Sequence, residues 1–350
     1  MKNSLEINRQ KDSEILTGYN FARASDTVFS EILTHDQFTK VNNKENLHIV
    51  YKNKDLLFYL NSNISLKENH VIFSTTDLVE ELFNILENNI NFKNLKLITH
   101  QSDISIDKKL FTKKPDCIST WYSTNINYKD KNLIPIPIGI SNNPAKNPMK
   151  DDFKKIFKNQ NQENKMYVNF QVNTNIKERE KLLKDFELID WAVVDSPDQK
   201  LNTYMDKLNN FKFILCPWGN GFDTHRFWES IYAGSIPITK KHISYESAKG
   251  LPVILVDQYI DITKEKLDSF SQNVNSNIGN YEKMSMKYWL SLISEIKLDD
   301  HDFEDQIRLN RNQISKVINE FNLNAKKVSS RKKIKFRINQ LKKLIKKLFV

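Results

Sequence analysis

The chain is poor in the two residues that most constrain a fold, glycine and cysteine. It has seven glycines and two cysteines in 350 residues. Because glycine makes up about 7% of an average protein, each glycine here is expected to occupy a position that needs it. Cys117 and Cys216 are too few for a disulfide framework, which favours a reducing compartment.

Long apolar runs are also missing from the sequence. The first twenty residues lack the apolar stretch of a signal peptide, and no later segment reaches the ~18 apolar residues of a membrane-spanning helix. We therefore expect a soluble, cytoplasmic body. A chain of 350 residues exceeds the usual size of one hydrophobic core, so two domains are expected.

Positive charge is concentrated at one end of the chain. The formal net charge is +10, but residues 326–350 hold eleven Lys or Arg and no Asp or Glu, which leaves the remainder at −1. The tail also carries an apolar stripe at helical spacing, formed by Ile334, Ile338, Leu341, Ile345 and Leu348. This pattern predicts a basic amphipathic helix that holds the protein on an anionic membrane surface, at the inner face of the cell membrane. Packing of the stripe on the body or on a partner is the alternative. A nucleic-acid partner is not expected, because the tail has little aromatic interleaving.

Short apolar runs alternate with amphipathic stretches along both halves of the chain. In the first half the predicted strands are NLHIVYK, LLFYL, HVIFST, LKLITH and CISTWYS. In the second half they are MYVNFQV, WAVVD, FKFILC, IPIT and LPVILVD. The alternation predicts an α/β fold of two doubly wound domains that face each other across a cleft.

Changes in composition mark the predicted domain boundaries. A segment rich in Asn, Pro and Lys separates the two series, so the first domain is predicted over 1–145, the linker over 146–164 and the second domain over 165–300. Residues 301–325 are predicted to be a helical C-terminal segment that leads into the tail at 326–350.

Three of the seven glycines fall within CPWGNGFDTHRFWESIYAGSIPI, residues 216–238. This stretch is predicted to run from a strand through a glycine loop, which includes Asn220, into a helix. Backbone N–H groups and a helix N-terminus meet in such a loop and bind anions. Gly219 and Gly221 are expected to permit close backbone approach or positive φ, and Gly234 to end the helix in the left-handed conformation.

The predicted helix that follows carries polar residues on one side. A period of 3.6 places His225, Arg226 and Glu229 together and turns Phe227 and Ile231 elsewhere. We expect Arg226 to clamp a diphosphate and Glu229 to accept hydrogen bonds from ribose hydroxyls. A surface ion pair between Arg226 and Glu229, with a purely structural His225, is the alternative.

Within this region, ESIYAGSIPI resembles the Glu-Ala-Ile-Tyr-Ala-Gly-Cys-Val-Pro-Val signature of exostosin-type glycosyltransferases. GNGFDTHRFWE is similar to the preceding segment in exostosin-like bacterial and viral proteins, and LITHQSD, IPIPIGI and VNTNIKERE show weaker similarity. The family is of the GT-B class, so the resemblance implies two Rossmann-like domains, the first on the acceptor side and the second binding the nucleotide-sugar. It also implies that Glu229 contacts the ribose. Animal exostosins are luminal and carry an N-terminal membrane anchor that this sequence does not show, which favours a microbial cytosolic enzyme.

The resemblance further implies inversion at the sugar carbon with no metal or other cofactor, so a general base is expected in the first domain. LITHQSD supplies Asp103, with His100 as the alternative, although Asp after a strand is also typical of a turn. VNTNIKERE repeats the strand-loop-helix plan and places Asn173, Thr174 and Arg179 near the donor. Thr174 or Asn175 is also expected as the cap of the helix, and capping is the alternative role for Thr174.

The sequence gives little support for a metal site. LDDHDFED, residues 298–305, contains Asp300 and Asp302, but it precedes the predicted helix QIRLNRNQISKVINEF, where acidic residues complement the helix dipole. Cys117 and His242 lack partner residues at ligand spacing.

The resemblance, together with these patterns, implies an inverting hexosyl- or pentosyltransferase that moves a sugar from a nucleotide-sugar to a lipid-linked glycan. Its product would be a cell-surface polysaccharide or glycolipid, such as capsule or lipopolysaccharide. Two alternatives stay open: transfer of a polyol phosphate or another activated group of the same pathway, and a non-catalytic protein that binds a nucleotide or an anionic lipid.

Overall fold

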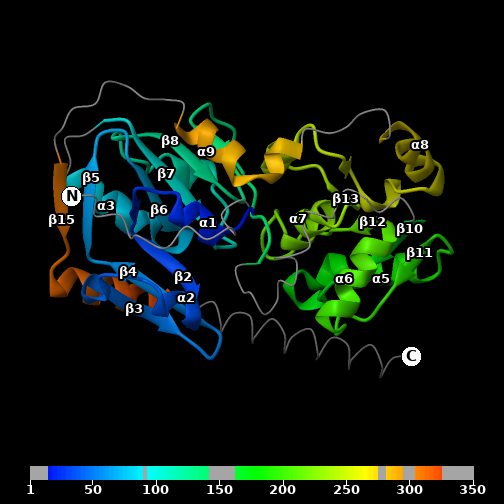
Figure 1. Cartoon of the computed structure of the whole chain (residues 1–350), viewed down its shortest axis with the longest axis horizontal. Helices are drawn as coiled ribbons and strands as arrows, with labels where there is room; N and C mark the ends of the chain where they lie inside the picture. Colours follow the sequence, from blue (N-terminus) through cyan, green and yellow to red (C-terminus); the bar gives the residue numbers. More distant parts are fainter. Residues whose placement is uncertain (1–14, 90–92, 142–161, 275–280, 295–303, 325–350) are drawn as a thin grey trace, which may run out of the picture.

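The structure is a computed structural model that describes residues 15–89, 93–141, 162–274, 281–294 and 304–324. Within this part of the chain, two parallel five-stranded sheets lie in separate halves of the molecule (Figure 1). In spatial order, the first sheet consists of β1 (Thr27–Val28), β6 (Val71–Thr75), β7 (Leu95–His100), β8 (Ile118–Ser123) and β9 (Leu133–Pro135). The second consists of β11 (Ala192–Val194), β10 (Glu163–Val168), β12 (Phe211–Leu215), β13 (Ile236–Lys240) and β14 (Ile254–Val256). The prediction of an α/β fold with parallel sheets is confirmed.

Helices cover these sheets and bury their apolar faces. Every residue of β7 is buried, as expected for a central strand that is covered on both sides. Leu82 and Leu86, on the helix over residues 79–89, are buried as well. The helices of the first half are α1 (Gly18–Arg23), α2 (His35–Thr39), α3 (Val79–Asn89) and α4 (Lys108–Phe111). Those that follow β10 are α5 (Ile176–Glu187), α6 (Leu201–Asn210), α7 (His225–Tyr232), α8 (Lys264–Val274) and α9 (Met286–Ser294).

An antiparallel sheet in the first half departs from the predicted doubly wound pattern. NLHIVYK and LLFYL do form strands, β3 (Leu47–Lys52) and β4 (Leu56–Asn61), but these pair with each other antiparallel. Strand β2 (Ser30–Thr34) joins the other side of β4. The reason is the connection at 53–55, because three residues can close a hairpin but cannot hold a crossover helix.

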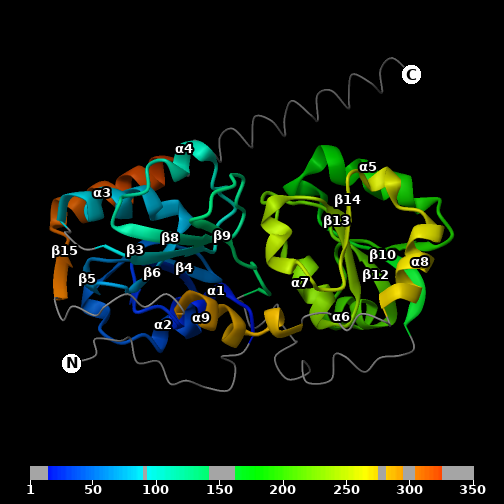
Figure 2. The same cartoon turned by 90° about the horizontal axis from the view of Figure 1, so that it is seen from above.

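The C-terminal part of the described chain returns to the first half. Strand β15 (Glu304–Arg308) pairs antiparallel with β5 (Asn63–Lys67), and a helix over 311–324 follows it. Figures 1 and 2 both show these orange elements beside the first sheet. Phe321 packs edge-on against Phe58, with ring centroids 5.1 Å apart. Within the predicted helical segment over 301–325, residues 311–324 do form a helix, whereas residues 304–308 form a strand because they pair with β5.

Several predicted features lie outside the described residues. These are 146–161 of the linker, Asp300 and Asp302, and the tail from 326 to 350. The predicted domain boundaries also stay predictions. Helix α9 belongs to the predicted second domain, but it contacts the first half, where the Lys96 ammonium donates to the carbonyl of Ile293.

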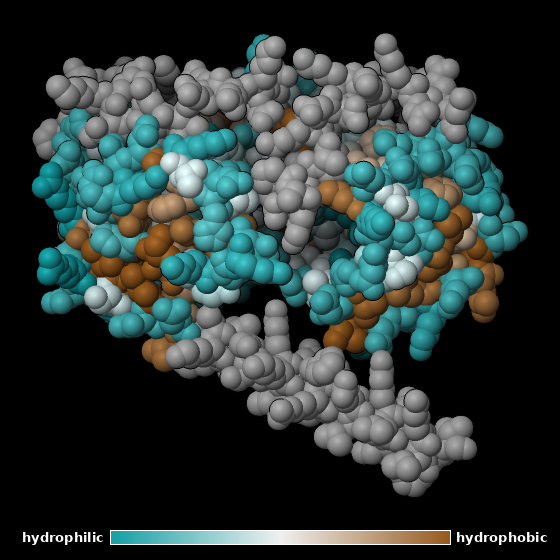
Figure 3. All heavy atoms as spheres, turned by 60° about the horizontal axis from the view of Figure 1, so that its bottom comes forward, coloured by the Kyte–Doolittle hydropathy of each residue, from teal (hydrophilic) through white to brown (hydrophobic). Residues whose placement is uncertain are grey.

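The surface of the described residues is mixed in polarity. Apolar patches stand among polar residues on both halves in the view of Figure 3. The exposed large apolar side chains include Ile49 and Tyr51 of β3. Among the helices described, none combines the length and the apolar character that crossing a membrane requires.

Candidate functional site

The glycine loop connects β12 to α7 and folds back on itself through a bond from the Gly219 N–H to the Gly221 carbonyl (3.1 Å). A Cβ on Gly221 would lie 2.7 Å from Asn125 Oδ1, so this glycine permits the close approach that the sequence predicted. Gly234 has φ 75°, as predicted for the residue that ends α7.

Contacts from this loop join the two halves of the molecule. The Asp223 N–H donates to Asn125 Oδ1 (2.9 Å), and the Ile138 N–H donates to Asp223 Oδ2 (2.8 Å). Beside them, His225 Nδ1 donates to the carbonyl of Gly139 (2.8 Å). Asn125 follows β8 and Asp223 follows β12, so loops from the carboxyl edges of both sheets touch here.

Neither Asn125 nor Asp223 was identified from the sequence, because their partners are far along the chain. Asp223 is 4% exposed and also accepts hydrogen bonds from Trp228 Nε1 (2.9 and 3.0 Å) and the Thr224 N–H (2.9 Å). Burial raises its pKa to about 7, although the bonds from Ile138, Trp228 and Thr224 act in the opposite direction. In the sequence, the one local feature that could have pointed to Asp223 is its position between a glycine loop and a predicted helix.

A test of the loop packing is the substitution Gly221→Ala. We expect it to destabilise the fold by about 2 kcal/mol, because the new methyl group meets the buried amide of Asn125. That amide is held on both sides, since its Oδ1 accepts from the Asp223 N–H and its Nδ2 donates to the Ser102 carbonyl (3.1 Å). In an Asn125→Ala background the same substitution should cost at least 1 kcal/mol less, which urea unfolding of the double-mutant cycle would show. Equal costs in both backgrounds would mean that Asn125 does not impose the glycine. Gly219→Ala is the matched control in the same loop. It should destabilise the fold less, since its Cβ would lie 3.3 Å from a side-chain nitrogen of Arg179.

Arg226 lies in the first turn of α7 with its guanidinium over the ring of Tyr204, at 4.9 Å from the centroid. Tyr204 in turn donates to Glu229 Oε2 (2.8 Å). Arg226 Nη1 is buried and has no hydrogen-bond partner among the described residues. Among the described residues, no ion pair joins Arg226 to Glu229. The alternative of a surface ion pair between them is therefore wrong. Phe227 and Ile231 are buried on the other side of the helix, as predicted.

Arg179 was also predicted to bind the donor, but its guanidinium instead donates hydrogen bonds to backbone carbonyls of the glycine loop and of the segment before α5. Its Nε donates to the carbonyl of Trp218 (2.9 Å), Nη1 to Gln171 (2.6 Å) and Nη2 to Pro217 (2.7 Å). Burial and then the charge of Arg226 lower its pKa to about 10. Two guanidinium groups near enough to repel each other create a positive potential at this edge of the second sheet.

Aromatic rings that were not predicted as a group from the sequence lie beside the two arginines. Phe222 and His242 stack with centroids 3.7 Å apart, and Trp218 packs edge-on against both, at 5.1 and 5.3 Å. Lys240 Nζ lies 4.3 Å from the centroid of Trp218. Burial lowers the pKa of His242 to about 4, so its ring is neutral at pH 7. Trp218 Nε1 is buried without a hydrogen-bond partner among the described residues.

The remaining predicted donor residues stand at the edge of this cluster. Asn173 and Asn220 are exposed. Thr174 ends a short 3-10 turn and donates to the carbonyl of Gln171 (3.4 Å), while Asn175 occupies the N-cap of α5 without a side-chain capping bond. Capping by Thr174 is therefore not what the structure shows.

The two candidate bases lie at the end of β7, where His100 is the last residue of the strand and Asp103 follows it, but their environments differ. His100 is 1% exposed, accepts a bond from the Gln101 N–H at Nδ1 (2.7 Å) and donates from Nε2 to the Pro137 carbonyl (3.2 Å). Burial, with His225 nearby, lowers its pKa to about 3. With both ring nitrogens occupied, His100 is not placed to take a proton from a substrate. Asp103 is exposed.

Groups of three or more His, Cys, Asp or Glu side chains that could hold a metal ion do not occur among the described residues. The chain matches no known family model, and it matches no curated protein.

Two solved structures show weak similarity. The crystal structure of the GtfA/B complex shares 9% identity at a TM-score of 0.31, over 75% of this chain and 58% of that one. The pneumococcal O-GlcNAc transferase GtfA, in complex with UDP and GlcNAc, shares 10% identity at a TM-score of 0.29, over 75% and 57%. The chain thus spans less than two thirds of either protein. TM-scores of this size do not establish a shared fold, and the resemblance to exostosin-type enzymes stays a prediction.

Proposed function

We propose that the protein is a glycosyltransferase that binds a nucleotide-sugar at the carboxyl edge of its second sheet. The observation that carries the proposal is the buried, unpartnered Nη1 of Arg226 in the first turn of α7. Buried polar groups in proteins almost always have a hydrogen-bond partner, so a nitrogen left without one favours a site that a ligand completes.

The charges around Arg226 favour a diphosphate as that ligand. Arg226 is held over Tyr204 and forms no ion pair with a described carboxylate, so its charge is available to an anion. Arg179 keeps the loop in place and adds a second positive charge. A planar guanidinium binds phosphate oxygens in pairs, whereas the carboxylate of Glu229 suits the hydroxyls of a ribose.

The fold and the cluster of rings fit the same proposal. Trp218, Phe222 and His242 offer flat apolar faces next to the arginines, on which a nucleobase can stack. The two halves then form the two domains of a GT-B enzyme that inverts the sugar carbon without a metal, with Asp103 as the candidate base. The acceptor is a glycan of the cell surface, carried on a lipid, and the tail at 326–350 holds the enzyme on the membrane.

A thermal-shift panel with UDP, GDP, CMP, ADP and dTDP tests the donor site. At 100 times its dissociation constant, one nucleotide should stabilise the wild type by about 2.7 kcal/mol. Arg226→Ala should lower that stabilisation to about 1.4 kcal/mol or less, because loss of the guanidinium weakens diphosphate binding at least tenfold. Arg311→Ala, which removes an exposed arginine from the helix over 311–324, should leave it intact. If none of the five nucleotides shifts the wild type, or if Arg226→Ala responds like the wild type, the proposed donor site is wrong.

A further inference from the structure

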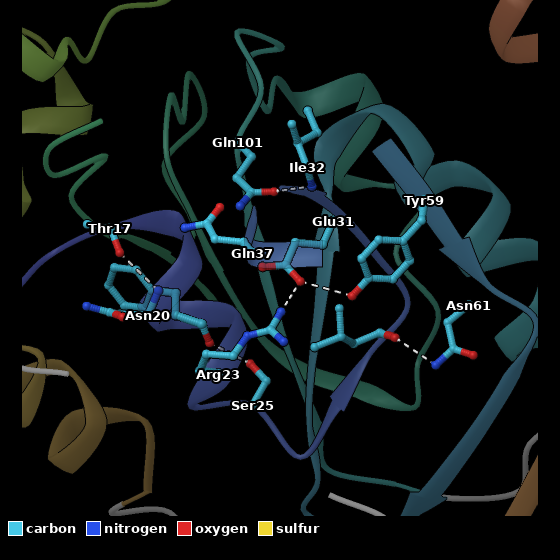
Figure 4. A network of polar contacts seen from close by, with 12 residues as sticks. Thr17, Asn20, Arg23, Ser25, Glu31, Ile32, Gln37, Tyr59, Asn61 and Gln101 are labelled. Carbon is cyan, nitrogen blue, oxygen red and sulfur yellow. Dashed lines mark hydrogen bonds and ion pairs between the residues drawn. The ribbon is translucent and has the colours of Figure 1, made fainter. Parts of the chain in front are cut away.

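A second polar network lies in the first half, among α1, β2 and β4 (Figure 4). Arg23 at the end of α1 forms an ion pair with Oε2 of Glu31 on β2. Tyr59 on β4 donates to the same oxygen (2.9 Å). The Glu31 side chain is fully buried, whereas that of Arg23 is 13% exposed, so the network reaches the surface on the Arg23 side.

Several polar atoms of this network are left without a partner. Glu31 Oε1, Arg23 Nε and Nη1, and Gln101 Nε2 are buried and have no hydrogen-bond partner among the described residues. The Gln101 amide is held in place because its Oε1 accepts a bond from the Ile32 N–H (2.7 Å). A buried ion pair destabilises a fold unless its remaining polar atoms also form hydrogen bonds. Four buried atoms without hydrogen-bond partners in one network therefore favour a bound ligand.

The backbone at Gln101 supplies an independent observation. Gln101 has φ 61°, in the left-handed region that few residues other than glycine, Asn and Asp adopt. Gly18 makes room for it, since a Cβ there would lie 2.7 Å from Gln101 Cγ and 2.6 Å from His100 Nδ1. Strain of this kind is retained where the surrounding structure holds a functional geometry.

The network also lies where α/β sheets bind ligands. Glu31 follows β1 and Gln101 follows β7, so both stand at the carboxyl edge of the first sheet. Two further hydroxyls at this edge, those of Thr76 after β6 and Thr124 after β8, are buried without hydrogen-bond partners among the described residues.

The donors and acceptors define the chemistry of the ligand. Arg23 and Glu31 carry opposite charges, so together they favour neither an anion nor a cation. They offer N–H donors from Arg23 and Gln101 next to a carboxylate acceptor on Glu31. A hydroxyl donates one hydrogen bond and accepts others, and a group of adjacent hydroxyls, as on a sugar ring, matches this set.

We propose that Arg23, Glu31 and Gln101 form a binding site for the hydroxyls of a neutral sugar, which is the acceptor side of the transfer reaction. The identity of that sugar as an acceptor rests on the proposed function. In this arrangement Tyr59 positions the Glu31 carboxylate through Oε2 and leaves Oε1 to the sugar.

The test is saturation-transfer NMR of the full chain with the methyl glycosides of glucose, galactose, mannose and N-acetylglucosamine. At least one glycoside should bind the wild type, and Glu31→Gln should weaken that binding at least tenfold, because the amide loses the acceptor at one oxygen. Glu45→Gln, an exposed glutamate of the same half, is the matched control and should bind as the wild type does.

A second variant guards against loss of folding in Glu31→Gln. Gln101→Asn withdraws the amide donor by one methylene, leaves the Arg23 and Glu31 pair intact, and suits the positive φ. It should also weaken binding at least tenfold. The proposal is overturned if no glycoside binds the wild type, if both variants bind as well as the wild type, or if inorganic phosphate competes with the glycoside.

The same samples separate this site from the nucleotide site. Glu31→Gln and Gln101→Asn should keep the nucleotide-induced thermal shift of the wild type. A glycoside that binds at Glu31 without any nucleotide response would leave the sugar site standing and refute the proposed function. A nucleotide-induced thermal shift without glycoside binding would leave the proposed function standing and refute the sugar site.

Discussion

Substitution of Gly139 by alanine should destabilise the protein by about 4 kcal/mol, a larger loss than we expect from Gly221→Ala. Gly139 has φ 64°, and a Cβ there would lie 2.0 Å from the carbonyl oxygen of Leu16. That oxygen already accepts a hydrogen bond from the Ile140 N–H (2.9 Å), and the Gly139 carbonyl accepts one from His225. Room for the new methyl group can therefore be made only by moving Gly139 away from Leu16, which disturbs these two hydrogen bonds.

Gly250→Ala is the matched control for this prediction. Gly250 also has positive φ, at 90°, so its substitution brings the backbone strain without the clash. We expect it to cost about 1 kcal/mol in urea unfolding. Equal costs for the two substitutions would show that the contact between Gly139 and Leu16 is not tight, and that the chain around Gly139 can move to admit a methyl group.

Asp223 should make the stability of the protein depend on pH in an unusual direction. Its folded pKa of about 7 lies above the 3.8 of an ordinary aspartate, so the folded state binds the proton more tightly than the unfolded chain does. The stability that this proton supplies is fully present below pH 4 and is lost as the pH rises through 7. Between pH 5 and pH 8, the wild type should lose on the order of 2 kcal/mol relative to Asp223→Asn, which does not titrate.

Urea unfolding of both proteins at pH 5, 6, 7 and 8 measures this difference. Using the difference between the variants cancels the contributions of the other titrating groups that both share. A wild type that gains stability over Asp223→Asn as the pH rises would show that the hydrogen bonds from Ile138, Trp228 and Thr224 outweigh the cost of burying the charge.

The central strands and α7 could be predicted from the sequence because their signals are local. LKLITH and FKFILC are apolar runs of strand length, and both became central strands of parallel sheets. In α7 the helical period alone separated Arg226 and Glu229 from the buried Phe227 and Ile231. Gly234 was predicted from its place after the helix, and its positive φ confirms it.

Features that depend on distant partners could not be predicted. Strand β15 reads as a polar segment, since Ile307 is its one buried residue, and it becomes a strand only by pairing with β5. Asp223 binds an N–H group 85 residues away. Glu31 could not be identified as a site residue, because a glutamate within a short strand gives no sign of the arginine and tyrosine that surround it in the fold.

Whether Arg226 binds the diphosphate of a nucleotide can be measured by calorimetric titration. The nucleotide that gives the largest thermal shift and its parent nucleoside would each be titrated into the wild type and into Arg226→Ala. We expect the wild type to prefer the diphosphate at least tenfold, and Arg226→Ala to lose this preference while it still binds the nucleoside. The same preference in both proteins would contradict it.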